Sequence, residues 1–133
     1  MKATIFIDGA ARGNPGPAGI GVLIRNENDI LLEVADYIGN TTNNQAEYMA
    51  LIRGLEEAID LEEDEVEVFS DSELLVKQIQ GEYRVKNEGL IPLHHHATTL
   101  IKEFKLFSIS HIRREKNKQA DKLANIGIDA RIK

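Results

Sequence analysis

Residues 3–25, ATIFIDGAARGNPGPAGIGVLIR, contain two apolar runs separated by a turn-forming segment. In the first run, 3–9, isoleucines alternate with other residues and both faces are mostly apolar, which is typical of a strand in the centre of a sheet. The glycines and prolines of 11–17 predict a tight loop. The second run, 19–26, then predicts a neighbouring antiparallel strand.

The rest of the chain adds a third strand and then alternates strands with helices. A polar turn at 26–29 leads into the third strand, and from residue 44 onward apolar residues recur at helical spacing. The predicted fold is α/β, with a five-stranded mixed sheet made of three antiparallel strands followed by parallel additions, and with helices on both faces. The further predicted elements are strands over 28–38, 66–70 and 106–112 and helices over 44–60, 71–81, 90–104 and 117–130.

Length and composition limit the classes of protein to consider. The 133 residues are 42% hydrophobic and contain no repeat, so we expect residues 1–133 to form a single domain. Without cysteine, neither a disulfide framework nor a thiolate zinc site can form. No stretch approaches the roughly 18 apolar residues of a membrane span, and the N-terminal apolar run is short. We therefore expect a cytoplasmic monomer that does not bind membranes.

The distribution of charge changes what the net charge implies. The formal net charge is −6, which by itself argues against a nucleic-acid-binding protein. Residues 1–100 carry 7 Lys and Arg against 18 Asp and Glu, whereas residues 101–133 carry 9 against 4. The C-terminal part is therefore basic enough to face phosphates.

Four acidic residues lie where neither a core pattern nor a surface pattern requires them. Asp8 ends the first strand, Asp71 follows the fourth, and Glu47 and Asp121 lie near the starts of two helices. Each has a structural explanation of its own, because Asp is common in turns and acidic side chains stabilise helix N-termini. Glu47 also follows Asn44 at the spacing of a capping box, and Asp71 is placed to cap a helix.

Taken together, the four acidic residues favour a metal site. Two of them fall at the carboxyl ends of strands, where ligands bind in such sheets, and two share helix faces with apolar residues and so point toward the sheet. Converging carboxylates repel one another and lose hydration, at a cost of several kcal/mol, unless cations neutralise them. Two Mg²⁺ ions about 4 Å apart could be held this way and could activate water for phosphodiester cleavage.

Four motifs stand out along the chain: FIDGAARGNPGPAG (6–19), TTNNQAEYMAL (41–51), VFSDSELLVKQI (68–79) and NKQADKLAN (117–125). In both order and spacing they resemble type 1 ribonuclease H, and the resemblance covers nearly the whole sequence. Members of that family cleave the RNA strand of RNA/DNA hybrids with four carboxylates and two Mg²⁺ or Mn²⁺ ions, leaving 5′-phosphate and 3′-hydroxyl ends. The resemblance therefore implies the ribonuclease H-like fold and an endonuclease activity.

The resemblance also assigns roles to individual residues. Asp8, Glu47, Asp71 and Asp121 match the family's metal ligands. Arg114 matches an arginine that replaces a catalytic histidine in relatives without the family's basic protrusion. Arg113 is the second candidate for this role. The alternative is that both arginines belong to a solvated basic loop without a catalytic role. The residues implied in substrate binding are Gly9 and Ala10 at the RNA sugar, Asn43, Asn44 and Gln45 in the minor groove, and Asn14 and Thr42 at a DNA phosphate. Arg12 and Asn117 are further predicted substrate contacts.

In place of the basic protrusion, residues 81–93 offer only Arg84, Lys86 and Tyr83 as nucleic-acid contacts, so we expect weak and salt-sensitive binding. Two alternatives stay open. The same fold could carry a nuclease for double-stranded RNA, because a fold does not fix its substrate, or a non-catalytic module that binds hybrid. The presence of all four carboxylates favours an enzyme. The expected partner is RNA/DNA hybrid or double-stranded RNA.

Overall fold

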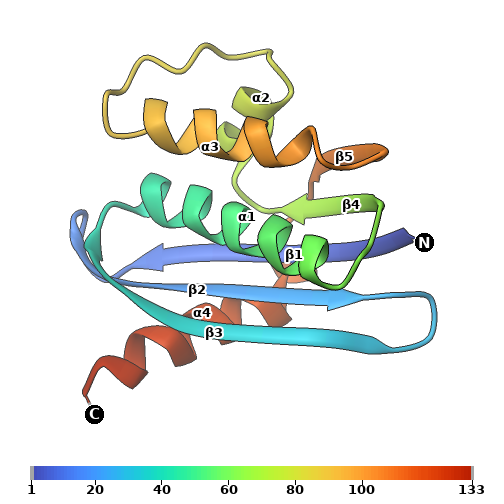
Figure 1. Cartoon of the computed structure of the whole chain (residues 1–133). Coiled ribbons are helices and arrows are strands. Elements are labelled where there is room, and N and C mark those ends of the chain that lie inside the picture. Colours follow the sequence, from blue (N-terminus) through green and yellow to red (C-terminus); the bar gives the residue numbers. More distant parts are fainter. Residues whose placement is uncertain (1, 133) are drawn as a thin grey trace.

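The computed structural model describes residues 2–132. Five strands form one mixed sheet, in which the strand that starts the chain is central (Figure 1). In chain order the elements are β1 (Lys2–Ala11), β2 (Gly16–Arg25), β3 (Ile30–Thr41), α1 (Asn43–Asp60), β4 (Glu65–Ser70), α2 (Glu73–Ile79), α3 (Ile91–Ile101), β5 (Leu106–His111), the 3-10 helix η1 (Arg114–Lys116), α4 (Lys118–Asp129) and the 3-10 helix η2 (Ala130–Ile132).

The strand order across the sheet is β3-β2-β1-β4-β5. β2 is antiparallel to both β1 and β3, whereas β4 is parallel to β1 and β5 is parallel to β4. Helices cover both faces: α1 packs on β1 and β2 from one side with α3 beside it, and α4 crosses β1, β2 and β3 on the other side (Figure 1). This arrangement confirms the predicted mixed sheet with helices on both faces.

The main core lies between α1 and the sheet. Ile5 and Ile7 from β1, Val22 from β2 and Leu51 from α1 are all fully buried. Gly54 faces them, and a Cβ placed there would lie 3.1 Å from Cγ2 of Ile5. The helix therefore packs close to the central strand, which holds its N-terminal turn at the carboxyl end of β1.

A glycine in β2 sets the distance between the sheet and α4. A Cβ on Gly21 would lie 2.1 Å from the carbonyl oxygen of Ala120, so the helix backbone rests directly on the strand. Gly21 is also the register partner of Asp8 in the antiparallel pair. Because the helix rests on this glycine, it carries Asp121 to a position beside Asp8.

The predicted elements are all present, with shifts at their ends. The first strand extends to Ala11, and the helix predicted over 90–104 spans only Ile91–Ile101. That helix ends early because Glu103 and Phe104 make turn hydrogen bonds to the carbonyls of Leu100 and Ile101. Within residues 2–132, none of the helices combines the length and apolarity required to cross a bilayer.

Candidate active site

The ends of two parallel strands bring the first acidic residues together. Ile7 pairs with Ser70 in the parallel register of β1 and β4, so the next residues along, Asp8 and Asp71, emerge side by side. Glu47, in the second turn of α1, adds a third carboxylate. Asp8, Glu47 and Asp71 each offer one carboxylate oxygen, and these oxygens lie within 4.8 Å of one another.

Asp121 completes the predicted set of four. It lies in the first turn of α4 and its carboxyl is a neighbour of Asp8. Arg114, the first residue of η1, adds an exposed guanidinium to the same place. The shared pocket has a volume of about 280 Å³ and is lined by Asp8, Gly9, Ala10, Asn43, Glu47, Asp71, Arg114 and Asp121.

Glu47 is held in place by the backbone of β1. The amide N–H of Gly9 donates a 2.8 Å hydrogen bond to Oε1 of Glu47. A Cβ on Gly9 would lie 2.2 Å from the carbonyl carbon of Ala46, so only glycine lets the strand approach the helix this closely. Gly9, which the resemblance implies in RNA binding, thus has a second role that was not predicted, although a glycine directly after Asp8 was the available signal.

The capping box expected from Asn44 and Glu47 does not form, because α1 begins one residue earlier than predicted. Thr42 is the N-cap, and its hydroxyl accepts a 3.1 Å hydrogen bond from the Gln45 amide. Oε1 of Gln45 in turn accepts a 3.2 Å hydrogen bond from the Thr42 amide. With the helix start satisfied by this pair, Glu47 is free to face the pocket.

The crowding of carboxylates raises their proton affinity. Burial, followed by the charges of Asp71 and Asp121, raises the pKa of Asp8 to about 8, and Arg114 only partly opposes this. Burial and the charge of Asp8 raise the pKa of Glu47 well above its usual range. Asp8 is only 5% exposed and Glu47 9%. These groups therefore need either protons or cations to remain together.

The donor set suits a hard divalent cation. The pocket offers carboxylate oxygens from four chain segments, and such oxygens are the ligands that Mg²⁺ and Mn²⁺ prefer. Among residues 2–132, no Lys or Arg forms an ion pair with any of the four carboxylates. The protein itself therefore leaves the negative charge of the pocket largely unbalanced.

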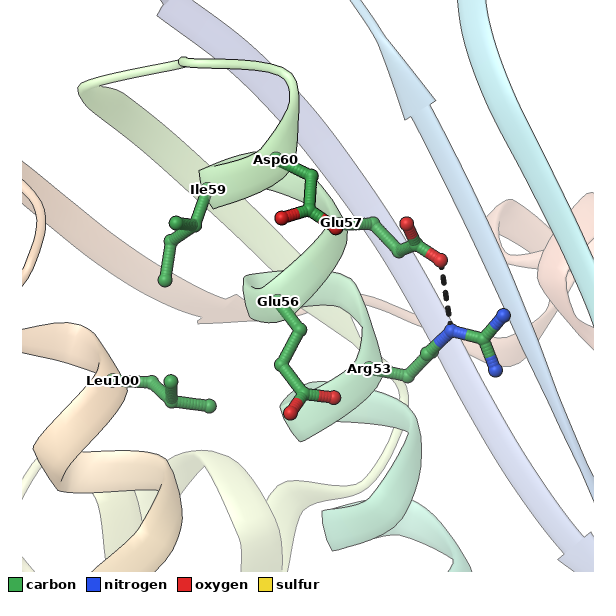
Figure 2. A pocket seen from close by; sticks show the side chains of 6 residues that line it. All are labelled: Arg53, Glu56, Glu57, Ile59, Asp60 and Leu100. Carbon is green, nitrogen blue, oxygen red and sulfur yellow. Dashed lines mark hydrogen bonds and ion pairs between the residues drawn. The ribbon is translucent and has the colours of Figure 1, made fainter.

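A second acidic pocket differs from the candidate site in how its carboxylates are neutralised. In the C-terminal half of α1, Arg53 donates to Oε2 of Glu57 at 2.9 Å (Figure 2). The same guanidinium donates to Asp36 at 2.6 Å. Glu56 and Asp60 in this pocket are exposed to solvent. These acids are thus paired or hydrated, and they do not converge as those at the end of β1 do.

Comparisons with known proteins agree with this geometry. A family model described as "Reverse transcriptase-like" matches residues 6–127. The solved structure of LC11-RNase H1 in complex with RNA/DNA hybrid superposes with a TM-score of 0.92 at 46% identity, covering 98% of this chain and 99% of that one. The chain belongs to the type 1 ribonuclease H family.

Two curated relatives of this ribonuclease H family member are longer than the chain. Ribonuclease HI of Halobacterium salinarum is 44% identical over 125 residues, which cover 93% of this chain and 63% of the relative. A bifunctional protein of Mycobacterium tuberculosis is 41% identical over 132 residues, which cover 98% of this chain and 36% of the relative. The chain thus spans about one third to two thirds of the length of these two proteins.

Several residues that the family resemblance implies in substrate binding also hold the loop beside the pocket in place. Oδ1 of Asn43 accepts a 2.8 Å hydrogen bond from the Ala11 amide, and the Asn43 amide donates at 3.0 Å to Oδ1 of Asn14. Asn44 is exposed at the start of α1, and Ala10 lines the pocket. The loop after β1 is therefore tied to the helix that carries Glu47.

Two of the implied contacts, Arg12 and Asn117, do not line the carboxylate pocket. The guanidinium of Arg12 pairs with Asp129 at 2.6 Å and reaches Oδ1 of Asn125 at 3.4 Å, so it is engaged by α4. Asn117 is 1% exposed and does not line the pocket.

The two candidate arginines are distinguished by position. Arg114 lines the pocket, whereas Arg113 lies 3.9 Å from the carboxylate of Glu115 and is highly exposed. The geometry of the pocket therefore favours Arg114 over Arg113 as the arginine of the site.

Proposed function

We propose that the chain is an endonuclease that hydrolyses the RNA strand of RNA/DNA hybrids with two Mg²⁺ or Mn²⁺ ions, leaving 5′-phosphate and 3′-hydroxyl ends. The observation that carries the proposal is the convergence of carboxylates in one pocket, with oxygens of Asp8, Glu47 and Asp71 within 4.8 Å of one another and Asp121 beside them. The ribonuclease names of the relatives, and the hybrid bound in the LC11 structure, support this substrate.

In this proposal the side chains of Asp8, Glu47, Asp71 and Asp121 would hold the cations. When bound, such ions lower the pKa of a water and neutralise charge on the scissile phosphate. The chain contributes rigid placement: Asp8 and Asp71 are fixed by strand register and Glu47 by the Gly9 amide. Fixed ligands of this kind avoid reorganisation during the reaction.

Arg114 has a separate role. A guanidinium keeps its charge and all its protons at any physiological pH, so it cannot act as a general acid or base. Exposed at the pocket rim, it is placed to bind the scissile phosphate and to stabilise charge there. Its fork of N–H donors suits phosphate oxygens.

Selection of hybrid would occur across the minor groove. In an A-like duplex the 2′-hydroxyls lie in a wide, shallow minor groove. Ala10 and Asn43 at the pocket, with Asn44 exposed beside them, present a small side chain and amides to that groove. We place Asn14 and Thr42 at the phosphates of the DNA strand. One hydrophobic core supports treating residues 1–133 as a single catalytic domain.

The test is cleavage of one 5′-labelled sequence as RNA/DNA hybrid, double-stranded RNA and double-stranded DNA, with Mg²⁺, Mn²⁺ or EDTA. Wild type is compared with Asp8→Asn and with Glu56→Gln, which removes an exposed carboxylate outside the site (Figure 2). Metal-dependent cutting of the hybrid that is lost only in Asp8→Asn is the expected result. Preferred cutting of double-stranded RNA would make that the substrate, and binding of hybrid without cutting would make the chain a binding module.

A further inference from the structure

Asn117 lies beneath the pocket at the junction of β1, β4 and α4. It is 1% exposed, and its Nδ2 donates a 2.8 Å hydrogen bond to the carbonyl oxygen of Ile7, the residue before Asp8. The same nitrogen donates at 3.4 Å to Oδ2 of Asp71. One amide group therefore joins the ends of two strands at the point where two carboxylates of the site emerge.

The backbone of Asn117 reaches the other side of the site. Its amide N–H donates a 2.9 Å hydrogen bond to the carbonyl of Arg114, and its carbonyl accepts a 3.1 Å hydrogen bond from the amide of Asp121. Asn117 is the N-cap residue of α4, although its side chain does not cap the helix. The side chain is instead directed to the strand ends.

The orientation of the Asn117 amide is determined by the two oxygens that it faces. Only the NH₂ half can donate to both Ile7 and Asp71, because the oxygen half would repel them. The oxygen, Oδ1, is buried and has no hydrogen-bond partner among residues 2–132. An unmatched buried acceptor lowers stability, and exceptions of this kind are expected where a residue serves a site rather than the fold.

We infer that Asn117 is a positioning residue of the metal centre. Its Nδ2 holds Asp71 against the end of β1, which fixes the spacing between the carboxylates of Asp71 and Asp8. The resemblance to ribonuclease H placed Asn117 among the substrate contacts, but the enclosed side chain acts on a cation ligand instead. This inference rests on the proposed function, since it concerns how the cations of that activity are held.

The experiment is calorimetric titration of Mn²⁺ into the free protein, without nucleic acid, for wild type, Asn117→Ala and Tyr48→Phe. Tyr48→Phe is the matched control, because it removes another buried hydrogen bond, the 2.7 Å contact to Gln78, away from the site. We expect Asn117→Ala to weaken Mn²⁺ binding about 10- to 100-fold, as removal of a residue that orients a metal ligand does. Tyr48→Phe should lower the Tm with unchanged Mn²⁺ affinity.

Kinetics on a short hybrid separate positioning from substrate contact. We expect Asn117→Ala to lower kcat and to raise the Mn²⁺ concentration needed for half-maximal rate, with KM for the hybrid unchanged. Wild-type Mn²⁺ affinity in Asn117→Ala, or a raised KM alone, would overturn the inference while leaving the proposed function intact. A wild type that binds no Mn²⁺ and cuts no hybrid would overturn both.

A measurement on the unaltered chain covers the case in which Asn117→Ala does not fold. In a ¹H–¹⁵N spectrum of wild type, the Nδ2 protons of Asn117 should exchange slowly and should shift when Mg²⁺ is added, because their acceptor, Asp71, becomes a metal ligand. The Nε2 resonance of Gln80, which donates to the backbone carbonyl of Ile109 at 2.8 Å, serves as the internal reference. A Mg²⁺ titration that shifts the backbone amide of Gly9, the donor to Glu47, but leaves the Asn117 signal unmoved would contradict the inference.

Discussion

The amide of Gly9 donates to the carboxylate of Glu47 over 2.8 Å, and this contact ties the end of β1 to the N-terminal part of α1. Two elements that are 38 residues apart in the chain are thus joined by one hydrogen bond inside the candidate site. The bond forms only because strand and helix backbones nearly touch. Any side chain at position 9 must therefore separate them.

Gly9→Ala should damage both stability and activity. The new Cβ would lie 2.2 Å from the carbonyl carbon of Ala46, so α1 has to move and takes Glu47 with it. We expect a loss of about 1–3 kcal/mol in the free energy of unfolding and a fall in kcat on the order of 100-fold. Urea denaturation and single-turnover kinetics measure the two effects.

Gly39→Ala is the control for this substitution. Gly39 has a φ of +84° but no atom within 4 Å of an added Cβ, so alanine there strains the backbone without moving α1. It should cost about 1–2 kcal/mol and leave kcat close to wild type. Equal loss of activity in both variants would mean that destabilisation alone explains the effect of Gly9→Ala.

The metal-free protein should become less stable as the pH rises. Asp8 has a pKa of about 8 in the folded state against an ordinary value of 3.8. Between these values the folded protein holds a proton that the unfolded chain has lost, so the free energy of unfolding falls with increasing pH. Urea denaturation in EDTA at about pH 5.5 and pH 8.5 should show this loss, and saturating Mg²⁺ should remove it.

Asp8→Asn should reverse part of that loss while abolishing cleavage. The amide carries no charge to be buried, so we expect a gain on the order of 1–3 kcal/mol over wild type at about pH 8.5 in EDTA, and a smaller gain at pH 5.5, where less of the pH-dependent loss has occurred. Denaturation curves of both proteins at both pH values decide this. Parallel pH profiles for the two proteins would show that Asp8 does not carry the effect.

Arg114→Ala should lower kcat on the order of 10- to 100-fold, because an unpaired phosphate charge is then left at the pocket rim. Arg113→Ala should stay within about 3-fold of wild type, since Arg113 is highly exposed and faces Glu115. Steady-state rates on hybrid at saturating Mg²⁺ compare the two variants. A larger effect from Arg113→Ala would exchange their roles.

Salt dependence should show whether the segment between α2 and α3 touches the duplex. Arg84 and Lys86 are exposed there, and Tyr83 is 47% exposed. In an Asp8→Asn background, replacing both cations by alanine should reduce the slope of log K against log salt by about 2. Fluorescence anisotropy gives the slope, and Arg53→Ala, which removes a cation held by Glu57 and Asp36, should leave it unchanged.

The sequence predicted the sheet and the convergence of its acids because both depend on local patterns. Alternation marked the strands, and the rule that ligands gather at the carboxyl ends of parallel strands placed Asp8 next to Asp71. Helical spacing predicted that Glu47 and Asp121 face the sheet. The resemblance to ribonuclease H, now confirmed as family membership, added the expected chemistry.

Contacts between distant residues were beyond such patterns. Helix α1 starts at Asn43 with Thr42 as its N-cap, and Asn43 bonds to Ala11 at the end of β1 and to Asn14 in the loop that follows. Arg12, predicted as a substrate contact, also pairs with a carboxylate 117 residues away. Asn117, predicted as another, donates from its side-chain amide to a backbone carbonyl 110 residues away. Neither partner can be read from spacing along the chain.

The close packing of α4 on Gly21 determines when the carboxylates of the site can come together during synthesis. Asp8 emerges from the ribosome almost first and Asp121 almost last among the described residues, and the two meet only when the final long helix has docked on β2. Such distant contacts form late, since loop closure must precede them. A nascent chain therefore has an incomplete set of carboxylates at the site. The proposed nuclease activity should begin only when α4 has docked on the sheet.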